Sequence, residues 1–132
     1  MGLTRKGEYA IRGMIFLARQ PAGNMVLIND IATAAEAPVS FLAKIFQAFA
    51  KSGLVNSARG SGGGFTLSRP AAEITLRQVV EVAEGPIIPN RCLLEDDLCG
   101  NQDCCKVHGV WRQVQRQVVD VLDQVTLAEI AA

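Results

Sequence analysis

The chain has 132 residues and a mass of 14.1 kDa, which suits one domain, or a small domain with an oligomerisation arm. Hydrophobic residues make up 49% of it, enough to form a core, yet no apolar run approaches the length of a membrane-spanning helix. The first residues, MGLTRKGEY, lack the apolar core of a secretory signal. We therefore expect a cytoplasmic protein without a membrane segment.

The formal net charge is zero, but the two halves of the chain differ in sign. Residues 1–70 contain eight Lys or Arg and three Asp or Glu, a net charge of +5, whereas residues 71–132 contain five and ten, a net charge of −5. Chance could produce such a division. A basic half joined to an acidic half nevertheless indicates that the first part binds a polyanion such as nucleic acid and that the second does not.

Three amphipathic segments in the basic half predict helices at residues 5–19, 28–36 and 39–52. In the third, apolar residues at i, i+3, i+4 and i+7 form one core stripe, and Gly53 follows as the helix stop. The opposite face is small, polar and basic, as expected of a helix that enters the major groove of DNA. Its predicted DNA-contacting residues are Ser40, Ala43, Lys44 and Gln47.

Two short strands at residues 54–57 and 65–67 flank a glycine-rich turn, so the predicted helices and hairpin follow in the order of a winged helix-turn-helix. The glycines permit positive φ at a tight loop tip. We expect Arg59 and Ser61 in this wing to contact DNA, with Arg59 reaching the minor groove. A phosphate-binding loop is the weaker interpretation, because no GK[ST] sequence follows and the glycines lead into a strand.

The acidic half begins with a predicted helix at residues 75–83, in which Thr75 and Gln78 form a capping box. Residues 86–104 form a loop too long for a plain connector, so it needs a ligand or another role that orders it. A long helix is predicted at residues 105–124, and Thr126 with Glu129 caps a last short turn.

The long helix carries a heptad seam, because valine and tryptophan recur along it with alternating spacings of four and three. The seam predicts a homodimer whose interface residues are Val107, Trp111, Val114, Val118 and Val121. A core helix buried within a monomer is the alternative. It is disfavoured because so small a domain has little else to cover the helix.

The four cysteines and the single histidine lie within residues 92–108, in the run CLLEDDLCGNQDCCKVH. Cys92, Cys99, Cys105 and His108 have the spacing C-x6-C-x5-C-x2-H, and the last two lie one helical turn apart. In a reducing compartment such a set indicates ligands rather than disulfides, and thiolates at a helix N-terminus favour a soft metal. An iron–sulfur cluster or structural zinc would suit this donor set, although Cys92 and Cys99 lack the short spacing that is usual in zinc knuckles. Cys104 is interpreted as a bystander.

Four segments of the chain resemble a known family: LTRKGEYAIRGM, PVSFLAKIFQAFAKSGLVNSARGSGGGFTLSRP, ITLRQVVEVAEG and CCKVHGVW. They are similar to the winged-helix regulators that include IscR, NsrR, RirA and CymR. The resemblance spans nearly the whole chain, and its most specific parts are SxRGxGGGF and the three cysteines that precede the long helix. It implies a homodimeric bacterial transcription factor that binds a double-stranded DNA operator and has no small-molecule substrate.

The resemblance also implies that an iron–sulfur cluster, [2Fe-2S] rather than [4Fe-4S], tunes the affinity for DNA. Cys92, Cys99 and Cys105 then hold the cluster with His108 as the fourth ligand. Glu8 is the alternative fourth ligand, since in some relatives a carboxylate near this position comes from the other subunit. The sequence departs from the family pattern in its longer first cysteine spacing and in the extra Cys104, and both leave room for another ligand set.

We therefore expect a mainly α protein with a small β-hairpin wing. A winged helix-turn-helix DNA-binding domain is predicted at residues 1–85, a cluster-binding loop at 86–104, and a dimerisation helix with a C-terminal turn at 105–132. The predicted function is a transcriptional regulator, such as a repressor, that senses iron, redox state or nitric oxide. A cluster-free or zinc-stabilised winged-helix regulator with thiol redox chemistry is the alternative. An enzyme is not expected, because His108 has no partnered acid or oxyanion loop.

Overall fold

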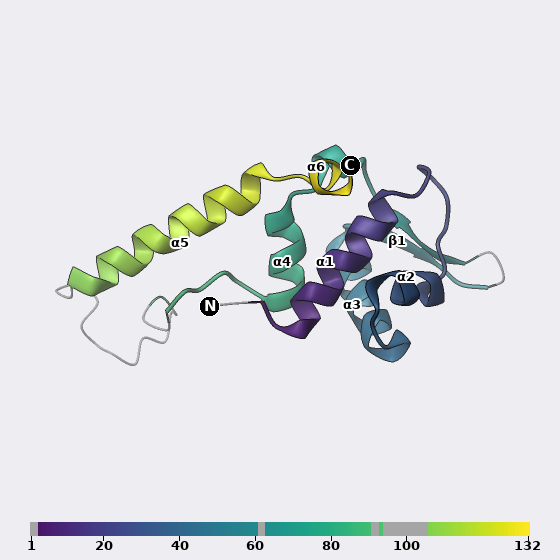
Figure 1. The fold of residues 1–132 in the computed structure, drawn as a ribbon, viewed down its shortest axis with the longest axis horizontal. Coiled ribbons are helices and arrows are strands. Elements are labelled where there is room, and N and C mark those ends of the chain that lie inside the picture. The colour runs from purple at the N-terminus through teal and green to yellow at the C-terminus, as the bar shows by residue number, and fades with distance from the viewer. Residues whose placement is uncertain (1–2, 61–62, 91–92, 94–105) are drawn as a thin grey trace.

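The computed structural model describes residues 3–60, 63–90, 93 and 106–132. Its elements are α1 (Arg5–Ala18), α2 (Ile28–Ala35), α3 (Val39–Ser52), β1 (Val55–Ala58), β2 (Gly64–Leu67), a 3-10 turn (Ala71–Glu73), α4 (Leu76–Glu84), α5 (Lys106–Gln124) and α6 (Leu127–Ala131). The hairpin projects from one end of the unit formed by α1, α2 and α3, and α5 extends from the opposite end (Figure 1). The predicted mainly helical fold with a two-stranded wing and a C-terminal helix is confirmed.

The helical unit is held together by the apolar stripes that the sequence predicts. Leu42, Ile45, Phe46 and Phe49 of α3 are all buried, and the rings of Phe46 and Phe49 meet edge-on with centroids 5.4 Å apart. Gly13 of α1 lets the two helices approach closely, since a Cβ there would stand 2.8 Å from the Phe46 ring. Burial of several large side chains supplies the main stabilising free energy of the unit.

The wing is an antiparallel hairpin in which Val55 pairs with Leu67 and Ala58 with Gly64. A third segment extends the sheet, because Val26 and Phe65 exchange backbone hydrogen bonds of 2.9 and 2.8 Å. The ring of Phe65 also meets Phe46 of the core with a centroid distance of 5.4 Å. The hairpin is therefore fixed to the helical unit both at its backbone and at its side chains.

A short backbone pairing attaches the C-terminal part to the same unit. The Leu76 N–H donates to the Val125 carbonyl (2.8 Å), and the Leu127 N–H donates to the Ile74 carbonyl (2.9 Å). Leu127 is fully buried in the core, and the Arg19 guanidinium donates to the Ala131 carbonyl at the end of α6. This pairing places the C-terminal end of α5 beside the beginning of α4.

Charged side chains reinforce the junction of α4 and α5. Arg77 forms an ion pair with Glu81 (Nε to Oε1, 2.9 Å) and lies 3.7 Å from an Asp123 carboxylate oxygen. The hydrogen bond to Glu81 is the main reason that the pKa of Arg77 is raised, and the charges of Glu81, Asp123 and Asp120 act in the same direction. Because these groups are partly exposed, the pairs contribute modestly to stability.

Candidate functional site

The outward face of α3 has the composition predicted for a DNA-reading helix. Pro38 precedes the helix in extended conformation, and Gly53 ends it in the left-handed region at φ +86°. Because the four apolar residues face the core, Ser40, Lys44 and Gln47 are exposed on the opposite side. Ala43 lies at the edge of this surface and is half-buried. The structure thus brings the four predicted α3 residues onto one side of the helix.

The turn of the wing presents the next predicted DNA contact. Arg59 is exposed directly after β1, and Gly60 beside it has a φ of +98°. Ser61, the other predicted contact of the wing, lies outside the described residues. The hairpin and α3 belong to one packed unit, so Arg59 and the α3 residues are held in a fixed relation to each other.

The predicted metal ligands are only partly visible. Cys92, Cys99, Cys104 and Cys105 lie outside the described residues, and within the described part no group of three or more potential ligand side chains comes together. His108, in the first turn of α5, is 9% exposed and is the one buried residue of that helix. Glu8, the alternative ligand, is exposed in the first turn of α1.

The buried side chain of His108 has a hydrogen-bonding atom that is not satisfied by the described residues. Its Nδ1 atom is buried and has no hydrogen-bond partner among the described residues. A buried imidazole nitrogen without a partner is costly, and coordination to a metal is one of the ways to satisfy it. The position of His108 therefore fits the donor set of three thiolates and one imidazole that the sequence predicts.

The apolar residues of α5 form one broad stripe that the described part of the chain covers unevenly. Trp111, Val114 and Val118 of the predicted seam are half-buried, whereas Val107 and Val121 expose 57% and 62% of their surface. Val110, which lies between them on the helix, is 57% exposed. A large part of the valine surface of α5 is therefore not covered by the described residues of the chain.

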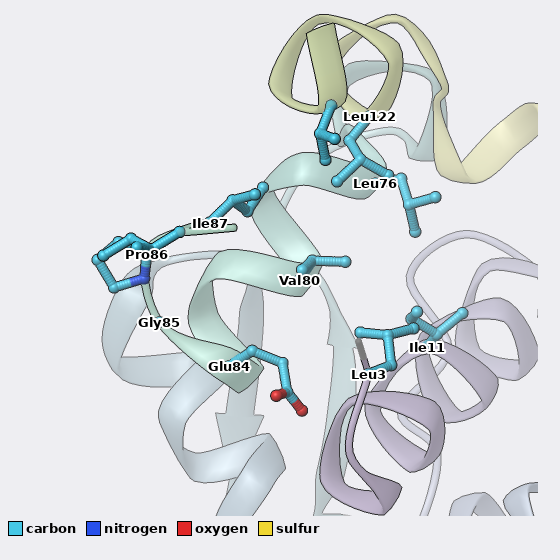
Figure 2. Close-up of a pocket in the computed structure, with 11 residues that line it drawn as sticks. Leu3, Ile11, Leu76, Val80, Glu84, Gly85, Pro86, Ile87 and Leu122 are labelled. Atoms are coloured by element: carbon cyan, nitrogen blue, oxygen red, sulfur yellow. The ribbon is translucent and has the colours of Figure 1, made fainter. Parts of the chain in front are cut away.

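An apolar pocket of about 330 Å³ marks the joint between α5 and the helical unit. Figure 2 shows Ile11 of α1, Val80 of α4 and Leu122 of α5 around it, with the carboxylate of Glu84 at one side. Glu84 accepts a hydrogen bond from the Thr4 hydroxyl at the beginning of α1. Segments from both halves of the chain therefore meet at this pocket.

One contact at this joint was not predicted from the sequence. The Gln115 side-chain amide of α5 donates to the Ile87 carbonyl (2.9 Å), at the beginning of the segment that contains the cysteines. The two residues are 28 positions apart, and no local pattern in the sequence connects them. Among the described residues, this hydrogen bond links the middle of α5 to the cysteine segment.

An exposed polar and basic helix beside a hairpin with an arginine at its turn defines a winged helix-turn-helix DNA-binding protein. The sequence profile of the Rrf2 family, described as an iron-dependent transcriptional regulator, matches residues 3–132. The chain belongs to this family and is a DNA-binding transcriptional regulator rather than an enzyme. The resemblance seen in the sequence is confirmed, and no described helix is long and apolar enough to cross a membrane.

Curated relatives and solved structures agree with this assignment. The chain is 34% identical over 131 residues to a putative HTH-type transcriptional regulator of Mycobacterium tuberculosis, covering 99% of this chain and 81% of the relative. It is 33% identical over 130 residues to IscR of Serratia proteamaculans, covering 98% and 79%. The structure of CymR, the global cysteine regulator of B. subtilis, matches with a TM-score of 0.78 at 29% identity, covering 99% and 96%. IscR of T. potens matches with a TM-score of 0.78 at 26% identity, covering 98% and 85%.

Proposed function

We propose that this protein is a homodimeric regulator whose affinity for a DNA operator depends on a bound iron–sulfur cluster. The observation that carries the proposal is the buried His108, whose Nδ1 has no partner among the described residues and which follows Cys105 by three positions in the sequence. The relatives named IscR and the iron-dependent description of the family support the same conclusion.

Cys92, Cys99 and Cys105 would hold the cluster through their thiolates, and His108 through an imidazole nitrogen. Soft sulfur ligands suit iron–sulfur clusters, and the N-terminus of α5 stabilises the anionic sulfur of Cys105. When bound, the cluster supplies a centre that can change its oxidation state. The cluster is lost when iron is scarce. We rank His108 above Glu8 as the fourth ligand, because His108 is buried and follows Cys105 by only three positions, whereas Glu8 belongs to the exposed surface of α1.

The DNA-binding surface consists of the outward face of α3 and the wing. Ser40, Ala43, Lys44 and Gln47 face the major groove in this proposal, and Arg59 with Ser61 reaches toward the minor groove. Lysine contacts to phosphates give affinity without sequence preference, whereas residues that reach base edges discriminate between sequences. The net charge of +5 over residues 1–70 supports this assignment of the surface.

The second copy of the chain covers the exposed valines of α5. Val107, Val110, Val114 and Val121 recur at intervals of three, four and seven residues, the spacing of a helix-pairing seam. Val114 in this stripe is half-buried. Two further half-buried members of the predicted seam, Trp111 and Val118, lie beside the stripe and complete the interface. An apolar stripe of this size on an otherwise polar helix favours association with another apolar surface.

The charges of α5 favour an antiparallel pair. Lys106, Arg112 and Arg116 precede Asp120 and Asp123, so the N-terminal part of the helix is basic and its C-terminal part is acidic. This order is unfavourable for the dipole of a lone helix, which prefers acids at its N-terminus and bases at its C-terminus. In an antiparallel pair, the basic part of each helix lies beside the acidic part of the other.

The signal passes from the cysteine segment to the DNA-binding unit through the joint at the pocket. Gln115 fastens the beginning of the cysteine segment to α5, and Leu122 of α5 faces the same pocket as Leu76 and Val80 of α4. Ligation of the cysteines restrains the segment and thereby the angle at which α5 leaves the helical unit. That angle sets the separation of the two α3 helices in the dimer, which must match the spacing of the half-sites.

A cluster-free or zinc-stabilised regulator that uses thiol redox chemistry is the second candidate. The similarity to CymR favours it, since that structure covers 99% of the chain and an oxidized form of Staphylococcus aureus CymR also matches, with a TM-score of 0.76. In this case the cysteines would respond to oxidants directly or hold a structural ion.

Anaerobic purification separates the two candidates. The cluster proposal expects visible absorption together with iron and inorganic sulfide in equal amounts in the protein as isolated. Protein that contains zinc, or no metal, and that cannot be reconstituted with iron and sulfide would overturn it in favour of the second candidate.

A further inference from the structure

Val39, the first residue of α3, has an apolar side chain that is not buried in the core. It is 42% exposed, although the other apolar residues of the α3 stripe, among them Leu42 and Phe46, are fully buried. The first turn of a helix is normally a favourable place for polar and acidic side chains. An exposed valine here therefore gains nothing from helix capping and little from the core.

Helix geometry places Val39 at one edge of the proposed DNA-binding face. At 3.6 residues per turn, Val39 and Ala43 lie one above the other, next to Ser40 and Gln47. The two residues form a short edge of methyl groups beside the polar centre of the face. Ala43 is half-buried, so Val39 is the member of the pair that projects further from the protein.

The exposed aromatic residue of the same turn has a different environment. Phe41 lies toward the other edge of α3, where its ring meets Tyr9 of α1 edge-on with centroids 5.7 Å apart. Its position is explained by contact within the chain. Val39 instead shares its side of the helix with the polar residues that are proposed to face DNA.

We propose that Val39, together with Ala43, recognises the 5-methyl groups of thymine in the operator. The N-terminal residues of a recognition helix are the ones that reach base edges, and the thymine methyl is the apolar group that the major groove presents. The inference rests on the proposed function only in that α3 must be the DNA-reading helix. It adds a preference for thymine that polar residues alone do not provide.

The test is a replacement of thymine by deoxyuridine, which removes only the methyl group. A palindromic duplex is first selected from random sequence with the full-length protein, and each thymine is then replaced in turn. The wild-type protein is expected to lose affinity about four-fold for each methyl group that it contacts, the equivalent of burying one such group. Val39→Ala should bind the unmodified duplex more weakly than the wild type does. Replacement of the contacted thymine by deoxyuridine should not lower the affinity of this variant further.

Two variants serve as controls. Lys44→Ala is expected to weaken binding to every duplex alike and to keep the wild-type ratio between thymine and deoxyuridine duplexes. Val39→Thr keeps the shape of the side chain and should show a reduced ratio at the same thymine. Because Val39 is exposed, the unfolding midpoints of both its variants should match that of the wild type.

The proposal is overturned if the wild type is insensitive to every deoxyuridine, or if Val39→Ala keeps the full wild-type set of penalties. A different result would refute the DNA-binding surface itself: unchanged affinity of both Lys44→Ala and Gln47→Ala would show that α3 does not read DNA. The two failures are therefore distinguishable in one series of binding measurements.

Discussion

Gly64 is the residue on which the geometry of the wing depends most directly. Its φ is +141°, and a Cβ at this position would overlap the carbonyl oxygen of Val26, the residue that pairs with Phe65. We predict that Gly64→Ala lowers the free energy of unfolding by about 1–3 kcal/mol, because a strained backbone and a steric overlap are introduced together. Denaturant unfolding of the two proteins measures the difference.

Gly60→Ala is the matched control for this prediction. Gly60 also belongs to the wing and has a positive φ of +98°, but no atom of a described residue other than its chain neighbours lies within 4 Å of the position of its Cβ. Gly60→Ala should therefore lower the free energy of unfolding by less than Gly64→Ala does. Equal costs for the two substitutions would mean that backbone conformation alone, and not contact with Val26, explains the glycine at position 64.

His108 is the residue on which the proposed cofactor site depends within the described chain. We predict that His108→Ala weakens or alters the visible absorption of the reconstituted protein, because it removes a buried imidazole three positions after Cys105 in the sequence. Glu8→Ala should leave the spectrum unchanged. Iron and sulfide contents measured beside the spectra check both variants, and a loss confined to Glu8→Ala would reverse the ranking of the fourth ligand.

At the scale of elements, the valine stripe of α5 leads to a prediction about dimerisation. Val121→Asp is expected to convert dimers to monomers, because it places a charge in the apolar stripe proposed to pair with a second copy. Val121 is 62% exposed within one chain, so the substitution should not disturb the monomer. Sedimentation velocity over a range of concentrations measures the change.

Gln113→Asp provides the control on the same helix. Gln113 is exposed on α5 and lies outside the valine stripe, so the same new charge should leave the dimer intact. If Val121→Asp still sediments as a dimer, the interface lies elsewhere. If Gln113→Asp also dissociates, added charge rather than the stripe is responsible.

The helices were predictable wherever one apolar stripe and clear end signals occur together. The predicted bounds of α3, residues 39–52, are those observed, because four core residues and Gly53 define them locally. The capping box of Thr75 and Gln78 is likewise present at the beginning of α4. The pairings of Val26 with Phe65 and of Thr75 with Thr126 were not predicted, because each joins segments far apart in the sequence and is set by packing.

The uneven covering of the apolar stripe of α5 was also beyond the sequence. The heptad count placed Val107, Trp111 and Val118 in one seam, but only the packed structure shows that Trp111 and Val118 are half-covered and Val107 is not. Periodicity identifies which residues share a helix face. It does not say how much of that face the rest of the chain covers.

At the scale of the whole molecule, the hydrogen bond from Gln115 to the Ile87 carbonyl is, among the described residues, a contact between the middle of α5 and the beginning of the cysteine segment. We predict that Gln115→Leu keeps the cluster and the dimer but reduces the difference in operator affinity between the holo and apo forms. Binding isotherms of both forms, compared with those of the wild type, measure the coupling. If the holo and apo forms of Gln115→Leu differ in operator affinity as much as those of the wild type, the signal passes by another route.

The candidate site was predictable as a set of residue types and not as an arrangement. The spacing of the cysteines and His108 indicated a metal site, but the burial of His108 is seen only in the folded chain. The same is true of the contact of Gln115 with Ile87. Residues of the site are thus visible in the sequence, whereas the connections between the site and the DNA-binding unit appear only in the folded chain.

Operator affinity before and after removal of the cluster decides whether the cluster regulates DNA binding by this protein. A single anaerobic preparation is divided, one portion is stripped of iron, and both are titrated with the same selected duplex at the same salt concentration. We expect the dissociation constants to differ by roughly 5- to 150-fold, the range of a coupling of about 1–3 kcal/mol. Equal dissociation constants for the holo and apo proteins would contradict it.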